Sequence, residues 1–133
     1  MLCTSVNSID ETVCAKGWSR TVRPPVSFTN RIKHIKLRQY DIPEGDIHEY
    51  ELDHLIPLSI GGAPDDPANL WPQPHQGTWT ADDKDALEAR IHRLVCDRRV
   101  PLAEAQQAMR TDWVAAYRKY MSRRSQAWHA GRG

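Results

Sequence analysis

The chain has few of the residues that build the simplest protein metal sites. It contains only three cysteines, Cys3, Cys14 and Cys96, and no C-x-x-C pair. A zinc site made of cysteine is therefore not expected. Three cysteines allow one disulfide with one thiol left over. If a pair is oxidised, we expect Cys14–Cys96, because it would tie the N-terminal arm to the central helix. That pair would indicate a secreted or periplasmic protein, and reduced thiols a cytoplasmic one; the sequence alone does not fix the redox state.

Long apolar runs are also missing. No stretch of 18 apolar residues occurs, so we expect no membrane-spanning segment and no membrane partner. The first residues, MLCTSVNSIDETVC, lack a cationic start followed by an apolar stretch, so no signal peptide is predicted. The length of 133 residues, with 40% hydrophobic and 26% charged residues, is typical of one globular domain. We predict a single domain over 1–133, with a polar N-terminal arm over 1–13 and a flexible tail over 125–133.

Charge is unevenly distributed, although the net charge is only +1. Residues 16–39 contain seven Lys or Arg and no acid, residues 40–89 contain twelve acids and one cation, and residues 90–133 contain ten Lys or Arg and three acids. Two basic segments around an acidic middle suit a polyanion that must reach a cation site. Solvated helix faces with balanced charge explain the same pattern equally simply.

The order of elements predicts an α+β fold that is mainly helical. A helix is expected after Pro24-Pro25, capped by Ser27 or Thr29. Residues 50–56 read as a strand, and 69–71 as a second strand that Pro72 ends, so together they form an irregular β-hairpin. A helix over about 81–97 follows, with Thr80 and Asp83 in capping-box positions. A last helix is expected from Pro101 to about residue 121.

Five motifs occur in this order, spread over roughly residues 14–120: TVRPPVSFTN (21–30), YELDHLIPLSIGG (50–62), NLWPQP (69–74), KDALEARIHRLVC (84–96) and AQQAMRTDWVAAY (105–117). Together they resemble small bacterial proteins of the HNH, or ββα-metal, nuclease family. The resemblance implies a central strand–turn–strand–helix motif that carries the active site. As a joint pattern it is specific, whereas a lone D-H-x-x-P would be weak.

The resemblance implies a metal-dependent endonuclease that cleaves DNA with low sequence specificity. His54 corresponds to the general base, Asp53 to a metal ligand, and Asn69 to the residue that braces the hairpin and helps to aim His54. Chemistry agrees with these roles, because phosphodiester hydrolysis needs a water deprotonated near neutral pH and a cation on the phosphate. Adjacent strand residues normally point to opposite faces, so Asp53 and His54 can share a site only if the strand bends or ends there.

The helix departs from the family pattern. Related sequences have A-H-x-K-D, whereas this chain reads Ala81-Asp82-Asp83-Lys84-Asp85, so Asp82 stands where a histidine ligand is expected. Asp82 is therefore predicted as a metal ligand, with Asp85 as a second candidate on the same helix face. Oxygen ligands favour Mg²⁺ or Mn²⁺ over Ni²⁺ or Zn²⁺, which remain open. Both acids also fit simple compensation of the helix dipole.

Six basic residues are candidates for contact with phosphate: Arg23, Arg31, Lys33, Lys84, Arg90 and Arg93. No base-reading element is recognisable, so DNA is the expected partner and RNA the less favoured one. A catalytically impaired nucleic-acid-binding module is the alternative, because Asp82 replaces the usual ligand. Small nucleases of this type are secreted, phage-encoded or the toxic end of an interbacterial effector. In the last case an immunity protein is the expected partner. The sequence does not choose among these contexts.

Overall fold

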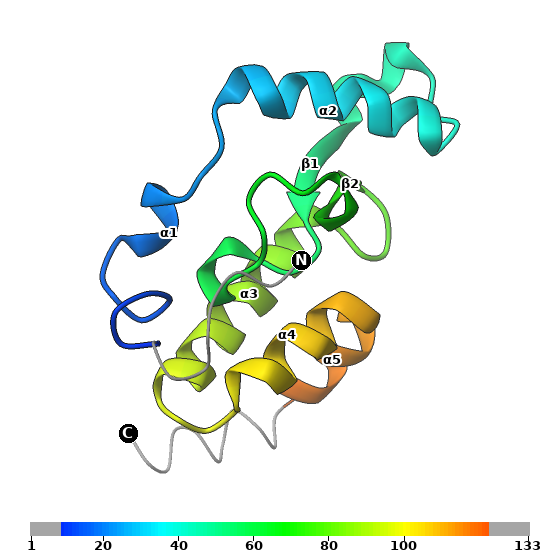
Figure 1. The fold of residues 1–133 in the computed structure, drawn as a ribbon. Helices are drawn as coiled ribbons and strands as arrows, with labels where there is room; N and C mark the ends of the chain where they lie inside the picture. The colour runs from blue at the N-terminus through cyan, green and yellow to red at the C-terminus, as the bar shows by residue number, and fades with distance from the viewer. Residues whose placement is uncertain (1–8, 123–133) are drawn as a thin grey trace.

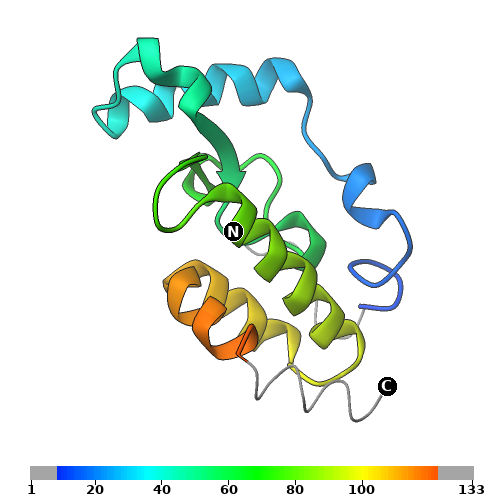
Figure 2. The same ribbon diagram turned by 180° about the vertical axis from the view of Figure 1, so that it is seen from behind.

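The computed structural model describes residues 9–122 and has the predicted mixed architecture, mainly helical with one small sheet. A two-stranded hairpin occupies the middle of the molecule (Figure 1). Helix α2 (Val26–Gln39) crosses one end of it, and the long helix α3 (Ala81–Cys96) lies beside it. The opposite view shows α4 (Leu102–Thr111) and α5 (Trp113–Tyr120) at the other end of the molecule (Figure 2). None of the described helices is long and apolar enough to span a membrane.

The hairpin is formed by β1 (Tyr50–His54) and β2 (Leu70–Pro74), paired antiparallel with His54 opposite Leu70. The prediction that Pro72 ends the second strand was wrong, since β2 continues to Pro74. The amide of His75 donates to the carbonyl of Glu49, and that of Leu55 to the carbonyl of Asn69. In an antiparallel pair, successive amides of a strand point alternately toward the partner strand and away from it. Since the amide of His75 points toward β1, Pro74 and Pro72 occupy positions whose nitrogen points away from it. Proline therefore costs this edge strand no ladder hydrogen bond.

Helix α3 begins and ends as predicted. Thr80 accepts from the amide of Asp83, and the Asp83 carboxylate accepts from the amide of Thr80, which completes the capping box. Its apolar stripe is buried, with Leu87 and Ile91 fully inaccessible. This stripe belongs to the main core. The polar residues Lys84, Asp85 and Glu88 of α3 lie toward β1, where the site forms.

The predicted last helix is two helices. α4 (Leu102–Thr111) and α5 (Trp113–Tyr120) meet at Asp112, whose backbone is extended. The Asp112 carboxylate accepts from the amide of Ala115 at 3.1 Å and so caps α5. Sequence periodicity missed the break because the apolar positions continue in phase across it, from Met109 to Trp113. Both of these side chains are buried.

Helix α2 begins earlier than predicted. Pro25 is its N-cap with φ −66°, so neither Ser27 nor Thr29 caps it. Proline suits this position because its fixed φ is compatible and the helix has no use for its amide. The 3-10 helix η2 (Glu44–Glu49) then leads into β1.

The predicted polar arm over 1–13 was wrong for the part that the structure describes. Ile9 and Val13 are 6% and 3% exposed and belong to the main core. The short helix α1 (Trp18–Thr21) follows them. The rest of the arm, including Cys3, and the predicted tail over 125–133 lie outside the described residues.

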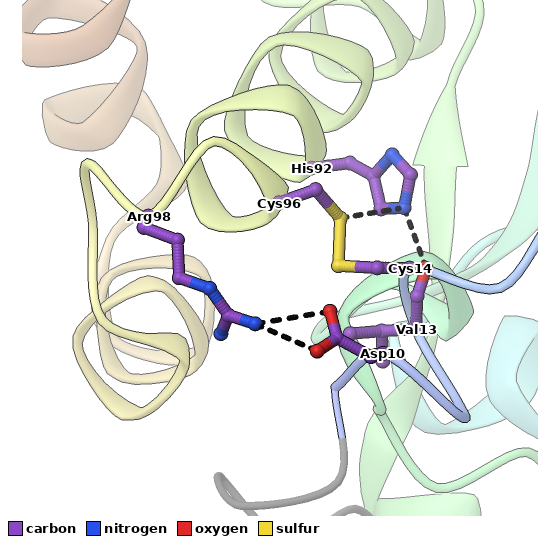
Figure 3. The surroundings of a disulfide bond; sticks show 6 residues. All are labelled: Asp10, Val13, Cys14, His92, Cys96 and Arg98. Atoms are coloured by element: carbon purple, nitrogen blue, oxygen red, sulfur yellow. Dashed lines mark hydrogen bonds and ion pairs between the residues drawn. A yellow bond between two sulfur atoms is a disulfide. The ribbon is translucent and has the colours of Figure 1, made fainter.

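The disulfide expected between Cys14 and Cys96 is present, with its Cα atoms 5.7 Å apart (Figure 3). His92, one turn before Cys96 on α3, donates from Nε2 to the carbonyl of Val13 at 2.7 Å. Nη2 of Arg98 donates to both carboxylate oxygens of Asp10, at 3.0 and 2.9 Å. These three links fasten the N-terminal segment to the end of α3.

Reduction of this disulfide should lower the free energy of unfolding by about 2–4 kcal/mol, because the bond closes a loop of 82 residues in the unfolded chain. Urea denaturation followed by tryptophan fluorescence, with and without reductant, measures the change. The double variant Cys14→Ser/Cys96→Ser is the control and should not respond to reductant. Equal midpoints for the oxidised and reduced protein would contradict this account.

Candidate functional site

The loop after β1 is held by a buried asparagine. Asn69 is fully inaccessible, and its side chain pairs with both the amide and the carbonyl of Ile56, at 2.9 and 3.0 Å. The same amide group also donates to the carbonyl of Ala63 at 3.1 Å. A Cβ on Gly62 would collide with the carbonyl of Ile56, so only glycine fits there. Asn69 thus bonds the loop backbone in the way that its predicted bracing role requires.

His54 receives its orientation from this loop. Its Nε2 lies 2.9 Å from the carbonyl oxygen of Pro64, the residue that follows Ala63. Because a carbonyl can only accept, Nε2 carries the proton and Nδ1 of the neutral ring keeps a lone pair. Burial lowers the pKa of His54 below 6.5, although the bond to Pro64 and the charge of Asp53 oppose the shift. The imidazole is therefore neutral at pH 7 and able to accept a proton.

Two adjoining clefts meet at His54. The larger, of about 380 Å³, lies between α2 and the hairpin, and the smaller, of about 180 Å³, extends toward α3. Four residues line both: Arg23, Glu51, Asp53 and His54. β1 ends at His54, which allows neighbours on the strand to reach one site, as the sequence required.

The smaller cleft gathers carboxylates. Asp85 and Glu88 from α3 line it together with Glu51 and Asp53 from β1. Burial raises the pKa of Glu51, and the charges of Asp85 and Asp53 raise it further. Burial and Asp53 likewise raise the pKa of Asp85. Asp82 is exposed and lines neither cleft, although its charge also acts on Glu51 and Asp85.

Sequence reasoning did not include Glu51 among the site residues. The alternation of strand side chains could have found it, because Glu51 and Asp53 are two residues apart and share a face of β1. Glu88 was also absent from the predicted site. Its contribution depends on Lys84, which the sequence placed in a different role.

Lys84 is a buried structural cation. Its side chain is inaccessible, and its Nζ lies 2.8 Å from Asp53 Oδ2, 2.5 Å from Glu88 Oε2 and 2.7 Å from the carbonyl oxygen of His54. An ammonium has three protons, and these three acceptors use all of them. The prediction that Lys84 contacts phosphate was therefore wrong.

Burial and the neighbouring charges shift the pKa values of Lys84 and Glu88. Burial alone would lower the pKa of Lys84, but the carboxylates of Asp53 and Glu88 outweigh it and raise that pKa above 10.5. Burial raises the pKa of Glu88 to about 7, against the opposing charge of Lys84. Lys84 thus remains charged and fixes both Asp53 and the backbone of His54 from α3.

The other predicted phosphate contacts separate into three groups. Arg23 and Lys33 line the larger cleft, and Arg23 also lines the smaller one. Arg31 and Arg93 are exposed but line neither cleft. The prediction for Arg90 was wrong, because its side chain is buried and its Nε donates to the carbonyl of Tyr120 at 3.3 Å. It joins α3 to α5 instead.

The oxygen donors at the smaller cleft suit some divalent cations better than others. Within residues 9–122, no three side chains of His, Cys, Asp or Glu are grouped closely enough to enclose a metal by themselves. Mg²⁺ does not need such a cage, since it commonly binds through one or two carboxylates, waters and substrate phosphate oxygens. Glu51, Asp53 and Asp85 provide oxygen donors whose mutual repulsion a cation would relieve. The residues therefore fit a hard cation better than Zn²⁺.

No protein-family model, curated protein or solved structure matched this chain significantly.

Proposed function

We propose that this protein is a metal-dependent endonuclease that hydrolyses phosphodiester bonds of DNA with low sequence specificity. One observation carries the proposal: the His54 ring is held by the Pro64 carbonyl, with Nδ1 unprotonated, where both clefts meet beside Asp53 and Arg23. A neutral histidine without a proton on one nitrogen is the expected general base at neutral pH. The HNH-like motifs of the sequence favour the same function.

In this reaction Nδ1 of His54 accepts a proton from a water whose oxygen attacks phosphorus. The P–O bond to the leaving oxygen breaks, and that oxygen takes up a proton from solvent. Arg23 neutralises the phosphate from the rim shared by both clefts. Asp53 and Asp85, with Glu51, would hold a divalent cation, which would stabilise the developing charge on the phosphate.

The compartment is part of the same proposal. The Cys14–Cys96 disulfide supports an oxidising location, such as the periplasm or the cell exterior. A secreted nuclease, a phage enzyme and a toxin domain with an immunity protein all remain compatible with this.

A second candidate function is nucleic-acid binding without cleavage. It is favoured by the position of Asp82, which lies outside both clefts although it stands where the family pattern has a histidine ligand. Plasmid nicking with Mg²⁺, Mn²⁺, Ni²⁺ or Zn²⁺, against a chelator control, separates the two functions. We expect nicking with Mg²⁺ or Mn²⁺, and an RNA substrate in the same assay tests the competing enzyme function. Binding of plasmid without nicking under every cation would favour the second candidate.

The carboxylates of α3 provide a matched pair of variants. Asp85→Asn should weaken Mn²⁺ binding by about ten-fold or more, because Asp85 lines the cleft with Asp53. Asp82→Asn makes the same change in charge one helical turn away and should weaken binding less. Calorimetric titration with Mn²⁺ measures both affinities. A larger loss for Asp82→Asn would restore Asp82 as the ligand, as the sequence first predicted.

A further inference from the structure

The larger cleft has a chemistry that the proposed hydrolysis does not require. Val26, Thr29, Asn30 and Lys33 lie on one face of α2 at helical spacing and form one wall. The facing wall comes from the hairpin and includes Tyr50, Leu52 and Leu70. A helix that merely covered a core would present apolar side chains to the hairpin. Here the residues that line the space are Thr29, Asn30 and Lys33, and the Thr29 hydroxyl donates to the carbonyl of Val26 at 3.1 Å.

Val26 is the second unusual feature. It is 70% exposed, more than any other large hydrophobic side chain within residues 9–122, and it lies at the rim of this cleft. Its position at the start of α2 places it next to the segment that carries Arg23. The cleft thus combines an apolar rim, an aromatic ring and polar groups with cations at Arg23 and Lys33.

We propose that the larger cleft binds one unpaired nucleotide next to the scissile phosphate, so that the protein cleaves single-stranded DNA in preference to duplex. The inference rests on the proposed function and specifies its substrate. Apolar and aromatic side chains would contact the base, and Arg23 and Lys33 the phosphates on either side. A volume of about 380 Å³ beneath α2 suits one nucleotide. A base that remains stacked and paired in a duplex cannot enter it without being turned out.

The division of charge between the clefts supports this assignment. All the acidic residues that line the larger cleft, Glu51 and Asp53, also line the smaller one. The part of the larger cleft beyond them carries cations and neutral groups. A nucleotide there would meet no carboxylate except at the end where its phosphate approaches the cation site.

The test compares Val26→Asp with Ile35→Asp. Both residues are exposed hydrophobic side chains of α2, but Ile35 does not line the cleft. An aspartate is tolerated at Val26, since it is the first residue of the helix. Two readouts are used: affinity for the dinucleotide pTpT in chelator, and cleavage of one labelled oligonucleotide as a single strand and as a duplex. A single-stranded RNA of the same sequence is a third substrate.

We expect Val26→Asp to weaken pTpT binding by about ten-fold and Ile35→Asp to leave it nearly unchanged. The wild-type protein should cleave the single strand about ten-fold faster than the duplex, and Val26→Asp should lose this preference. Equal pTpT affinities for the two variants, or equal rates on single strand and duplex, would overturn the inference. Binding of pTpT that depends on Val26 without any cleavage would support the cleft and refute the proposed nuclease. Faster cleavage of the single-stranded RNA than of the DNA would support binding of an unpaired nucleotide and contradict DNA as the substrate.

Discussion

His54→Ala should reduce plasmid nicking by about 10²–10⁴-fold, the usual loss when a general base is removed. The reason is geometric: Nε2 is fixed by the carbonyl of Pro64, so Nδ1 alone can take the proton. The rate should be measured on supercoiled plasmid with saturating Mg²⁺. Nicking by purified His54→Ala at the wild-type rate would show that another group is the base.

The same variant also tests whether the lower rate comes from loss of the base and not from loss of folding or of metal binding. Removing the ring loses one hydrogen bond to Pro64, which contributes about 0.5–1.5 kcal/mol, so the protein should remain folded. Mn²⁺ affinity should change little because Asp53 and Asp85 remain. The wild-type rate should fall as pH drops below 6.5 and be flat above it, since burial places the pKa of His54 below that value. A rate that still rises steeply above pH 7 would assign the base to a different residue.

Local patterns predicted the parts of this fold that depend on neighbours in sequence. The capping box at Thr80 and the apolar stripe of α3 are visible as residue types at fixed spacing, and both are present. The break at Asp112 is not visible in this way, because the apolar period continues across it. Pro72 was misjudged for a related reason, since only the pairing register tells whether a proline amide points toward the partner strand.

The sequence also predicted the candidate site only in part. Asp53, His54 and Asn69 were identified from a motif, and the structure brings them together around one loop. The roles of Lys84 and Arg90 depend on which side of α3 faces the hairpin and α5. From charge alone, both were predicted to contact phosphate, whereas both side chains are buried in the structure. A buried cation is exceptional for the residue type, so composition cannot predict it.

The packing of Lys84 leads to the largest expected loss of stability. Lys84→Met preserves the length and apolar stem of the side chain but leaves Asp53 and Glu88 without their shared ammonium. Breaking a buried ion pair by removing one partner costs about 3–5 kcal/mol. The melting temperature should therefore fall by roughly 10–20 °C for a chain of this length.

The double variant Lys84→Met/Glu88→Gln separates charge from packing. If unpaired negative charge causes the loss, neutralising Glu88 should recover more of it at alkaline pH, where this carboxyl ionises, than near pH 7, where burial without Lys84 keeps it protonated. Lys84→Arg is the second comparison: it keeps the charge, but its larger planar group cannot place three protons on the same three oxygens. Thermal and urea denaturation measure all three variants. Were Lys84→Met to melt like the wild type, the ion pairs would contribute nothing to stability and His54 would owe its position to the Asn69 loop alone.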